Sequence, residues 1–240
     1  DAFVRPQPVA QPSMDIVASQ IEPDSYSGQV ACVIGGSRGL GELTAKIISA
    51  GGGDVMVSYM LGLEDAKRVR DEIVNWGGRC SIVHMDVEQP EASIDEILKA
   101  PLSHLYYFAS PRIDQSKSGI FDASLYEIFN RIYVTAFGEI MISLSTRMDQ
   151  GCCVFYPSTV FLDELPRDFG EYISAKAAGE SLCQHLGRYM ADFPIIVRRL
   201  PMLPTDQTEA LLRKNMADPL VELRRIVSEL HHCFKEKFEC

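Results

Sequence analysis

A tyrosine and a lysine stand four residues apart in the segment Tyr172-Ile-Ser-Ala-Lys176. On a helix this spacing places both side chains on one face. An ammonium beside a phenol favours the phenolate and lowers a pKa that is normally about 10, which suits proton transfer near neutral pH. The pair alone is common by chance, so a helix-surface tyrosine and lysine are the alternative interpretation.

A hydroxyl group precedes this pair at the end of the apolar run 152–156. Ser158 lies fourteen residues before Tyr172, where its hydroxyl could meet the Tyr172 oxygen across a substrate carbonyl. Thr159, thirteen residues before Tyr172, is the alternative. The side-chain alternation of a strand favours Ser158. The sequence therefore predicts Ser158, Tyr172 and Lys176 as the catalytic residues.

Three glycines lie between the apolar run 29–34 and a helical stretch at 40–50. In such a loop one glycine permits the tight turn, one lets backbone N–H groups approach a pyrophosphate, and one lets the helix pack close to the sheet. The spacing is wider than G-x-G-x-x-G, and a purely steric turn is the alternative, but the position between a strand and a helix favours dinucleotide binding. The expected cofactor-binding residues here are Gly35, Ser37, Arg38, Gly39, Leu40 and Gly41.

The end of the second apolar run bears on the choice of cofactor. An NAD site usually carries an acidic residue there for the ribose 2′-hydroxyl. This chain has Ser58 and two uncharged residues after it, with no carboxylate until Glu64. Arg38 can offer a guanidinium fork to a 2′-phosphate, with a solvated loop arginine as the alternative. The sequence therefore predicts NADPH (NADP) rather than NADH, with Ser58 at the cofactor.

Apolar runs alternate with helical stretches along the chain, which predicts a parallel sheet with helices on both faces. The fold class is therefore α/β, a doubly wound sheet of the Rossmann type in a single domain at 28–240. Residues 1–27 carry four prolines and are predicted to be a linker or an extended strap over the surface. The expected strands are 29–34, 55–59, 80–85, 105–109, 152–156 and 195–200, and the expected helices include 40–50, 64–75, 94–98, 124–147 and about 172–191.

Composition excludes several functions for a chain of this kind. The 33 acidic residues exceed the 23 basic ones, giving a net charge of −10, which disfavours nucleic-acid binding. No apolar run approaches the roughly 20 residues that span a bilayer. The seven cysteines are scattered without a CxxC pair, which favours a reducing, cytoplasmic location. His231 and His232 are adjacent and point different ways on a helix, so no metal site is predicted.

With these motifs in order, the chain resembles the short-chain dehydrogenase/reductase family over residues 28–208. Ketoreductases that act on acyl chains held by carrier proteins resemble it most. The lack of an initiator Met indicates a processed chain or, as we favour, a domain cut from a larger synthase. The matching segments are 35–41, Asp86 with Val87, Ala109, Ser158, Tyr172 with Lys176, and Pro201 with Thr205.

The resemblance implies an NADPH-dependent reduction of a ketone. The ketone would be a small molecule or a carrier-bound β-keto acyl thioester. NADPH would deliver hydride to the carbonyl carbon while Tyr172 protonates the oxygen that Ser158 holds. Lys176 would bind the nicotinamide ribose and tune Tyr172. The cofactor would also meet Asp86 at the adenine and Thr205 at the carboxamide, with Val87, Ala109 and Pro201 beside it.

The chain also departs from the family pattern. The strand-four motif Asn-Asn-Ala-Gly is replaced by Tyr107-Phe-Ala-Ser110, and Tyr133 stands near the place of the Asn that holds a water in the family's proton relay. These changes motivate the alternative of a catalytically impaired cofactor-sensing or scaffold protein. The segment 218–230 reads as a helix with Asp as N-cap and Pro at its first position, so a seventh strand is expected to be absent.

Assembly follows from the same resemblance. The family's dimer interface would use helices 124–147 and 172–191, whereas its tetramer interface uses the strand expected to be absent. An uncovered sheet edge invites association, so the N-terminal segment, the C-terminal helix or a neighbouring synthase domain should cover it. The prediction is a homodimer or a monomer.

Overall fold

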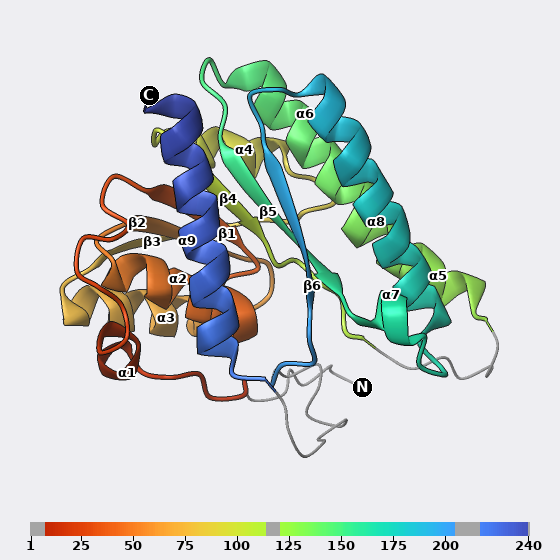
Figure 1. The fold of residues 1–240 in the computed structure, drawn as a ribbon, viewed down its shortest axis with the longest axis horizontal. Helices are drawn as coiled ribbons and strands as arrows, with labels where there is room; N and C mark the ends of the chain where they lie inside the picture. Colours follow the sequence, from red (N-terminus) through yellow and green to blue (C-terminus); the bar gives the residue numbers. More distant parts are fainter. Residues whose placement is uncertain (1–7, 114–120, 205–216, 240) are drawn as a thin grey trace.

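The computed structural model describes residues 8–113, 121–204 and 217–239. Its six strands form one sheet in the order β3-β2-β1-β4-β5-β6 (Figure 1). Every neighbouring pair is parallel, which confirms the predicted doubly wound α/β fold. The strands are β1 (Val30–Ile34), β2 (Asp54–Tyr59), β3 (Arg79–His84), β4 (His104–Tyr107), β5 (Cys153–Thr159) and β6 (Ile195–Leu200).

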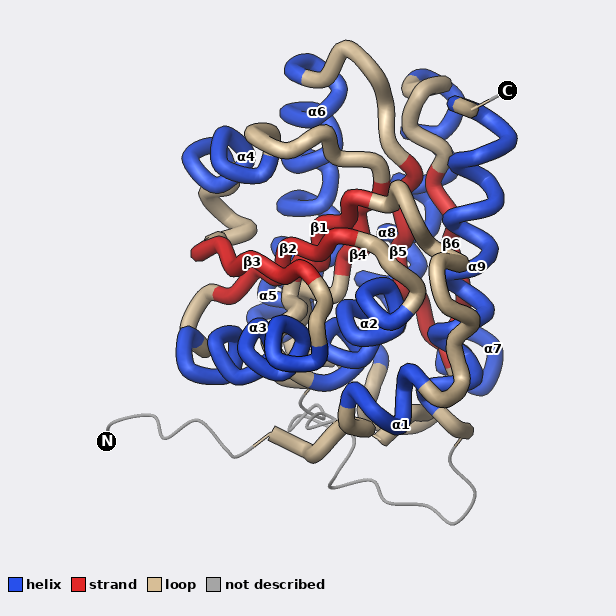
Figure 2. Tube along the Cα trace, turned by 90° about the vertical axis from the view of Figure 1, so that its left-hand side faces the viewer, coloured by secondary structure: helices blue, strands red, loops and turns tan. Residues whose placement is uncertain are grey.

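Helices cover both faces of the sheet (Figures 1 and 2). One layer contains α2 (Gly39–Ala50), α3 (Leu63–Trp76) and α9 (Pro219–Phe238), and its side chains share a core cluster with the sheet. The opposite layer contains α4 (Glu91–Ile97), α5 (Ala123–Asn130), α6 (Phe137–Arg147) and α8 (Gly170–Tyr189). The helix expected over 124–147 is interrupted by a π-helical turn, η1 (Arg131–Ala136). Two short helices, α1 (Met14–Ala18) and α7 (Phe161–Glu164), complete the described elements.

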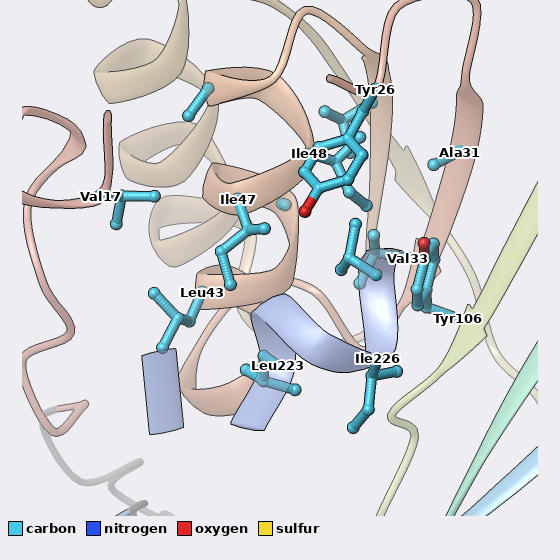
Figure 3. Packing of buried hydrophobic residues seen from close by; sticks show 14 of the residues in the cluster. Val17, Tyr26, Ala31, Val33, Leu43, Ile47, Ile48, Tyr106, Leu223 and Ile226 are labelled. Atoms are coloured by element: carbon cyan, nitrogen blue, oxygen red, sulfur yellow. The ribbon is translucent and has the colours of Figure 1, made fainter. Parts of the chain in front are cut away.

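The central strand β1 explains the sheet's two cores. Ala31 and Val33 face the cluster under α2 and α9, whereas Cys32 and Ile34 face the cluster under α6 and α8. A strand buried on both faces needs a continuous apolar run rather than an alternating one. Ile47 of α2 packs on the first face (Figure 3), and burying such a side chain stabilises the fold by about 1.5–3 kcal/mol.

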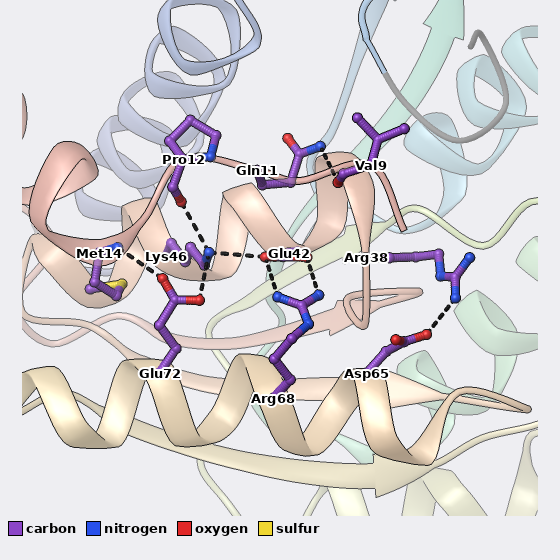
Figure 4. A network of polar contacts seen from close by, with 10 residues as sticks. All are labelled: Val9, Gln11, Pro12, Met14, Arg38, Glu42, Lys46, Asp65, Arg68 and Glu72. Atoms are coloured by element: carbon purple, nitrogen blue, oxygen red, sulfur yellow. Dashed lines mark hydrogen bonds and ion pairs between the residues drawn. The ribbon is translucent and has the colours of Figure 1, made fainter. Parts of the chain in front are cut away.

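The segment before β1 is attached to helices α2 and α3. The Lys46 ammonium donates to the Pro12 carbonyl at 3.0 Å and pairs with the carboxylates of Glu42 and Glu72 at 2.9 and 2.8 Å. The Met14 N–H donates to Glu72 Oε1 at 2.9 Å (Figure 4). Lys46 is fully buried, and three oxygens satisfy its ammonium.

This segment also contributes to the core rather than only crossing the surface. The Tyr26 hydroxyl lies 2.8 Å from the Ser228 hydroxyl of α9, which joins parts of the chain 202 positions apart. Four apolar side chains of this segment are buried in the cluster under α2 and α9. They are Met14, Val17, Ile21 and Tyr26.

Strand β6 forms one edge of the sheet, and among residues 201–204 and 217–239 no strand follows it. Two neighbouring arginines on β6 reach opposite helix layers: Arg198 pairs with Glu229 of α9, and Arg199 pairs with Glu180 of α8. Charged side chains on an edge strand disfavour pairing with another chain. Helix α9 begins as predicted, because the Asp218 side chain caps it ahead of a proline. No helix in the described part of the chain could span a membrane.

Candidate active site

The three predicted glycines each meet a separate steric demand. Gly35 has φ +75°, and a Cβ there would lie 2.8 Å from the Phe108 carbonyl. Gly39 begins α2 with φ +58°. A Cβ at Gly41 would overlap the Gly35 carbonyl. The loop can therefore exist only with a bare backbone, and it leaves the first N–H groups of α2 as anion donors.

Ser58 positions this loop. Its Oγ accepts from the Gly35 N–H at 3.0 Å, and its carbonyl accepts from the Gly36 N–H at 3.2 Å. Ser58 is buried, because β2 lies beside β1 in the sheet. That Ser58 meets the cofactor stays a prediction: its Oγ accepts from the glycine loop, and its O–H is the group that could reach the cofactor.

Arg38 is paired with a carboxylate. Its Nη2 donates to Asp65 Oδ2 at 2.5 Å, and each side chain is about one-fifth exposed (Figure 4). Asp65 lies in the first turn of α3, beside the Glu64 that the sequence analysis singled out. The ion pair holds the guanidinium at the carboxyl end of β1 and next to the end of β2.

The remaining predicted cofactor residues lie at the carboxyl ends of the strands. Because all strands are parallel, these ends lie along one side of the sheet, where open α/β sheets bind ligands. The Asp86 carboxylate follows β3 and accepts from the Glu88 N–H at 3.0 Å. On the same side, just after strands, are Ser37, Leu40, Val87, Ala109 and Pro201, whereas Thr205 lies outside the described residues.

Of Ser158 and Thr159, it is Thr159 whose hydroxyl acts on the Tyr172 phenol. The Thr159 side chain lowers the pKa of that phenol, whereas Ser158 Oγ donates to Glu180 Oε1 at 2.6 Å. Thr159 is the last residue of β5, and its Oγ1 also accepts from the Phe161 N–H at 3.2 Å. The chain turns there, so strand alternation stops predicting the direction of the side chain.

Tyr172 also differs electrostatically from the expectation. Burial raises the pKa of its phenol to about 12, and the Thr159 hydroxyl opposes this only in part. The Lys176 ammonium instead donates to the Pro157 carbonyl at 2.8 Å. The predicted lowering of the Tyr172 pKa by Lys176 is therefore wrong: at neutral pH the phenol holds its proton.

Lys176 is buried beside aromatic rings. Burial lowers its pKa to about 7, against the opposing effects of Cys183 and Glu180. Its Nζ lies 3.8 Å from the centroid of the Tyr133 ring. The ammonium and the neutral amine are thus both accessible near physiological pH.

Glu180, which lies one turn beyond Lys176 on α8, was not among the residues predicted from the sequence. Arg199 forks onto it with bonds of 2.9 and 2.8 Å and also donates to Asp163 of α7 at 2.5 Å. These contacts keep the pKa of Glu180 below its usual value, with Arg199 the largest cause. Continuing the i, i+4 spacing from Tyr172 by one more step would have found Glu180. Within the described residues no group of three or more metal-ligating side chains occurs.

Comparison with known proteins identifies the family. The family model described as short chain dehydrogenase matches residues 29–215. The chain belongs to the short-chain dehydrogenase family.

Similar proteins include two reductases of Arabidopsis thaliana. The chain is 26% identical over 196 residues to NADPH-dependent aldehyde reductase 2, chloroplastic, covering 73% of this chain and 71% of that protein. It is 25% identical over 185 residues to an NADPH-dependent aldehyde reductase-like chloroplastic protein, covering 69% and 68%. A short chain dehydrogenase from Burkholderia cenocepacia, solved in complex with NADP, shares the fold with a TM-score of 0.75 and 20% identity, covering 86% and 91%.

Proposed function

We propose that this protein is an NADPH-dependent reductase that converts a ketone to an alcohol. One observation carries the proposal: the phenol of Tyr172, which burial keeps protonated, lies beside the Thr159 hydroxyl and one helical turn from Lys176. A positioned proton donor beside a second hydroxyl suits the protonation of a carbonyl oxygen.

The cofactor assignment is supported by the glycine loop and by the charges near it. The bare backbone at Gly35 and Gly41, beside the start of α2, fits a pyrophosphate. Arg38 supplies the cation for a 2′-phosphate, and Asp86 the acceptor for the adenine. NADPH, when bound, supplies the hydride for the substrate carbon. Two similar proteins are named as NADPH-dependent, and a third was solved with NADP.

Each residue of the chain then has a defined task. Tyr172 donates its proton to the substrate oxygen, so that hydride and proton together give the alcohol and leave the oxidised cofactor. Thr159 holds the same oxygen by a hydrogen bond, the task that the family pattern gave to Ser158. Lys176 holds the nicotinamide ribose and supports the proton of Tyr172.

The side chains around Tyr172 favour an apolar substrate. Phe129 and Phe161 contact its ring at centroid distances of 5.7 and 6.3 Å, and Phe169 and Ile173 belong to the same buried cluster. We propose a ketone on an apolar acyl chain, either free or carried as a thioester. The six described cysteines are free, which supports action in the reducing cytoplasm.

The test is to incubate the protein with NADPH and a panel of β-keto thioesters and simple ketones. The fall in absorbance of the reduced nicotinamide reports turnover, and Tyr172→Phe serves as the matched control. Turnover that disappears in the control supports the reductase. Tight NADPH binding without turnover of any carbonyl would favour the cofactor-sensing or scaffold alternative.

A further inference from the structure

Three residues that depart from the family motifs meet at the π-helical turn η1. The Tyr107 phenol donates to the Ile132 carbonyl at 2.7 Å, and the Tyr133 hydroxyl lies 2.6 Å from Ser110 Oγ. The Tyr156 phenol donates to the Tyr133 carbonyl at 2.9 Å. A π-turn breaks the regular α-helical hydrogen bonding and is frequent at functional sites. Here phenols bond two of the carbonyls in the turn.

These bonds place the Tyr133 ring against the ammonium of Lys176. The Nζ atom lies 3.8 Å from the Tyr133 centroid, 5.2 Å from that of Tyr156 and 5.9 Å from that of Tyr172. A cation within about 6 Å of an aromatic face is attracted to it, most strongly when water is excluded. Tyr133 is the nearest of the three rings.

Few other groups stabilise the Lys176 ammonium, so the Tyr133 ring contributes an important share of its stabilisation. On α8 these are Glu180 and Cys183, and on β5 the Pro157 carbonyl, which accepts one bond. Both oxygens of Glu180 accept from Arg199, so this carboxylate is already bonded to another cation.

We propose that Tyr133 is a positioning residue whose ring face holds the Lys176 ammonium beside Tyr172, and that Ser110 fixes this ring through its hydroxyl. The inference rests on the proposed function, in which Lys176 serves Tyr172. It assigns Tyr133 and Ser110 together to the place of the family's water-holding Asn. Ser110 is exposed and Tyr133 is buried, so their bond anchors a buried ring at the protein surface.

The test measures the titration of Lys176 by NMR of protein labelled at the lysine Cε carbons. Lys176→Met assigns the signal. The parent midpoint is expected near pH 7. Tyr133→Phe keeps the ring and should stay within a few tenths of a pH unit of the parent. Tyr133→Leu removes the ring face without admitting water and should lower the midpoint by about one pH unit, a tenfold change in the protonation equilibrium.

Further variants complete the design. Ser110→Ala removes the same hydrogen bond as Tyr133→Phe, so these two variants should have equal midpoints. Tyr189→Phe, at the exposed end of α8, is the matched control and should equal the parent. If Tyr133→Leu does not fold, Tyr133→Met repeats the test. Equal midpoints for Leu (or Met) and the parent, or equal displacement by Phe and Leu, would overturn the proposal.

The measurement does not depend on turnover, so it separates the two proposals. A displaced midpoint in a protein that reduces no carbonyl would contradict the proposed function and leave the interaction between Tyr133 and Lys176 standing. In an active protein, Tyr133→Phe should keep the parent pH dependence of kcat, and Tyr133→Leu should move its midpoint with that of Lys176.

Discussion

Ser158 and Glu180 are joined by a 2.6 Å hydrogen bond from the serine hydroxyl to the carboxylate. The bond ties the end of β5 to the middle of α8, and Arg199 of the edge strand completes the connection. The serine predicted to be catalytic thus also connects β5 to α8, and its neighbour Thr159 is the hydroxyl that lowers the pKa of the Tyr172 phenol.

We predict that removing the Thr159 hydroxyl lowers kcat, whereas removing the Ser158 hydroxyl lowers stability. Thr159→Val should lower kcat by about 10²-fold, because a donor to the developing oxyanion is lost. Ser158→Ala should leave kcat within a few-fold and lower the free energy of unfolding by roughly 1.5–3 kcal/mol, the contribution of a hydrogen bond to a charged group. Steady-state kinetics and urea unfolding of both variants check this. A kcat loss for Ser158→Ala that is larger than the loss for Thr159→Val would assign the catalytic hydroxyl to Ser158 instead.

The proton held by Tyr172 predicts a directional pH dependence. With a pKa near 12 the phenol is protonated across the physiological range, so its contribution to ketone reduction should not vary with pH there. Alcohol oxidation needs the phenolate, so its rate should rise about tenfold per pH unit toward pH 12. The Tyr172→Phe variant, which has no phenol, should cut the rate of reduction by roughly 10²–10⁴-fold with little change in NADPH affinity. Rates in both directions from pH 6 to 10 test this, and an oxidation rate independent of pH would contradict it.

Arg38 should determine the preference for NADPH over NADH. Arg38→Ala should shrink that preference by roughly 1.5–3 kcal/mol, because one charged hydrogen bond to the 2′-phosphate disappears. Asp65→Asn is the matched control, since it breaks the same ion pair and keeps the guanidinium. Calorimetric titration with both cofactors measures the effect. Equal affinities in the parent, or equal losses in the two variants, would argue against this role.

A buried histidine predicts sensitivity to acid. His104 is fully buried beside His231, and burial lowers its pKa to about 3. The unfolded chain binds this proton near pH 6.5 and the native chain does not, so the free energy of unfolding should fall as pH falls from 6.5 toward 3. The loss is about 1.4 kcal/mol per pH unit for this group.

Urea unfolding between pH 7 and 5 measures the loss. His104→Leu should flatten the dependence by that amount, whereas the exposed His185→Gln should not. Identical slopes for the parent and His104→Leu would show that this histidine does not govern acid stability.

We predict a homodimer or a monomer in solution. Exposed Ile128 of α5 and Ile142 of α6 lie on the helices of the expected dimer interface, whereas the edge strand carries the paired Arg198 and Arg199. Ile142→Glu should convert a dimer to a monomer. Light scattering at about 107 kDa, four times the 26.7 kDa chain, would contradict the prediction.

The fold was predictable because its signals are local. A short apolar run such as 30–34, bounded by glycines, indicates a strand buried on both faces, and the glycines at 35, 39 and 41 follow it directly. The candidate active site was less predictable from the sequence. The hydroxyl directions depend on where β5 ends, and the pKa of Tyr172 depends on burial by rings from other elements. Neither quantity is encoded in residue spacing.

The N-terminal segment is a second feature that the sequence pattern predicted incompletely. Four prolines indicated an extended linker, yet Met14, Val17 and Ile21 recur at near-helical spacing and are buried. That spacing is a local signal, but the partners of these side chains come from α2 and α9, far away in the sequence, so the prolines outweighed it.

The hydrogen bond between Tyr26 and Ser228 has a consequence for the order of folding. It joins residues 202 positions apart, and the cluster around it needs Leu223 and Val227 of α9. Contacts of such sequence separation slow folding, because a long loop must close first. On the ribosome, the apolar side of α2 would stay uncovered until residues 219–238 have been made. A nascent chain paused before that helix would therefore be the species most prone to aggregation and most in need of a chaperone.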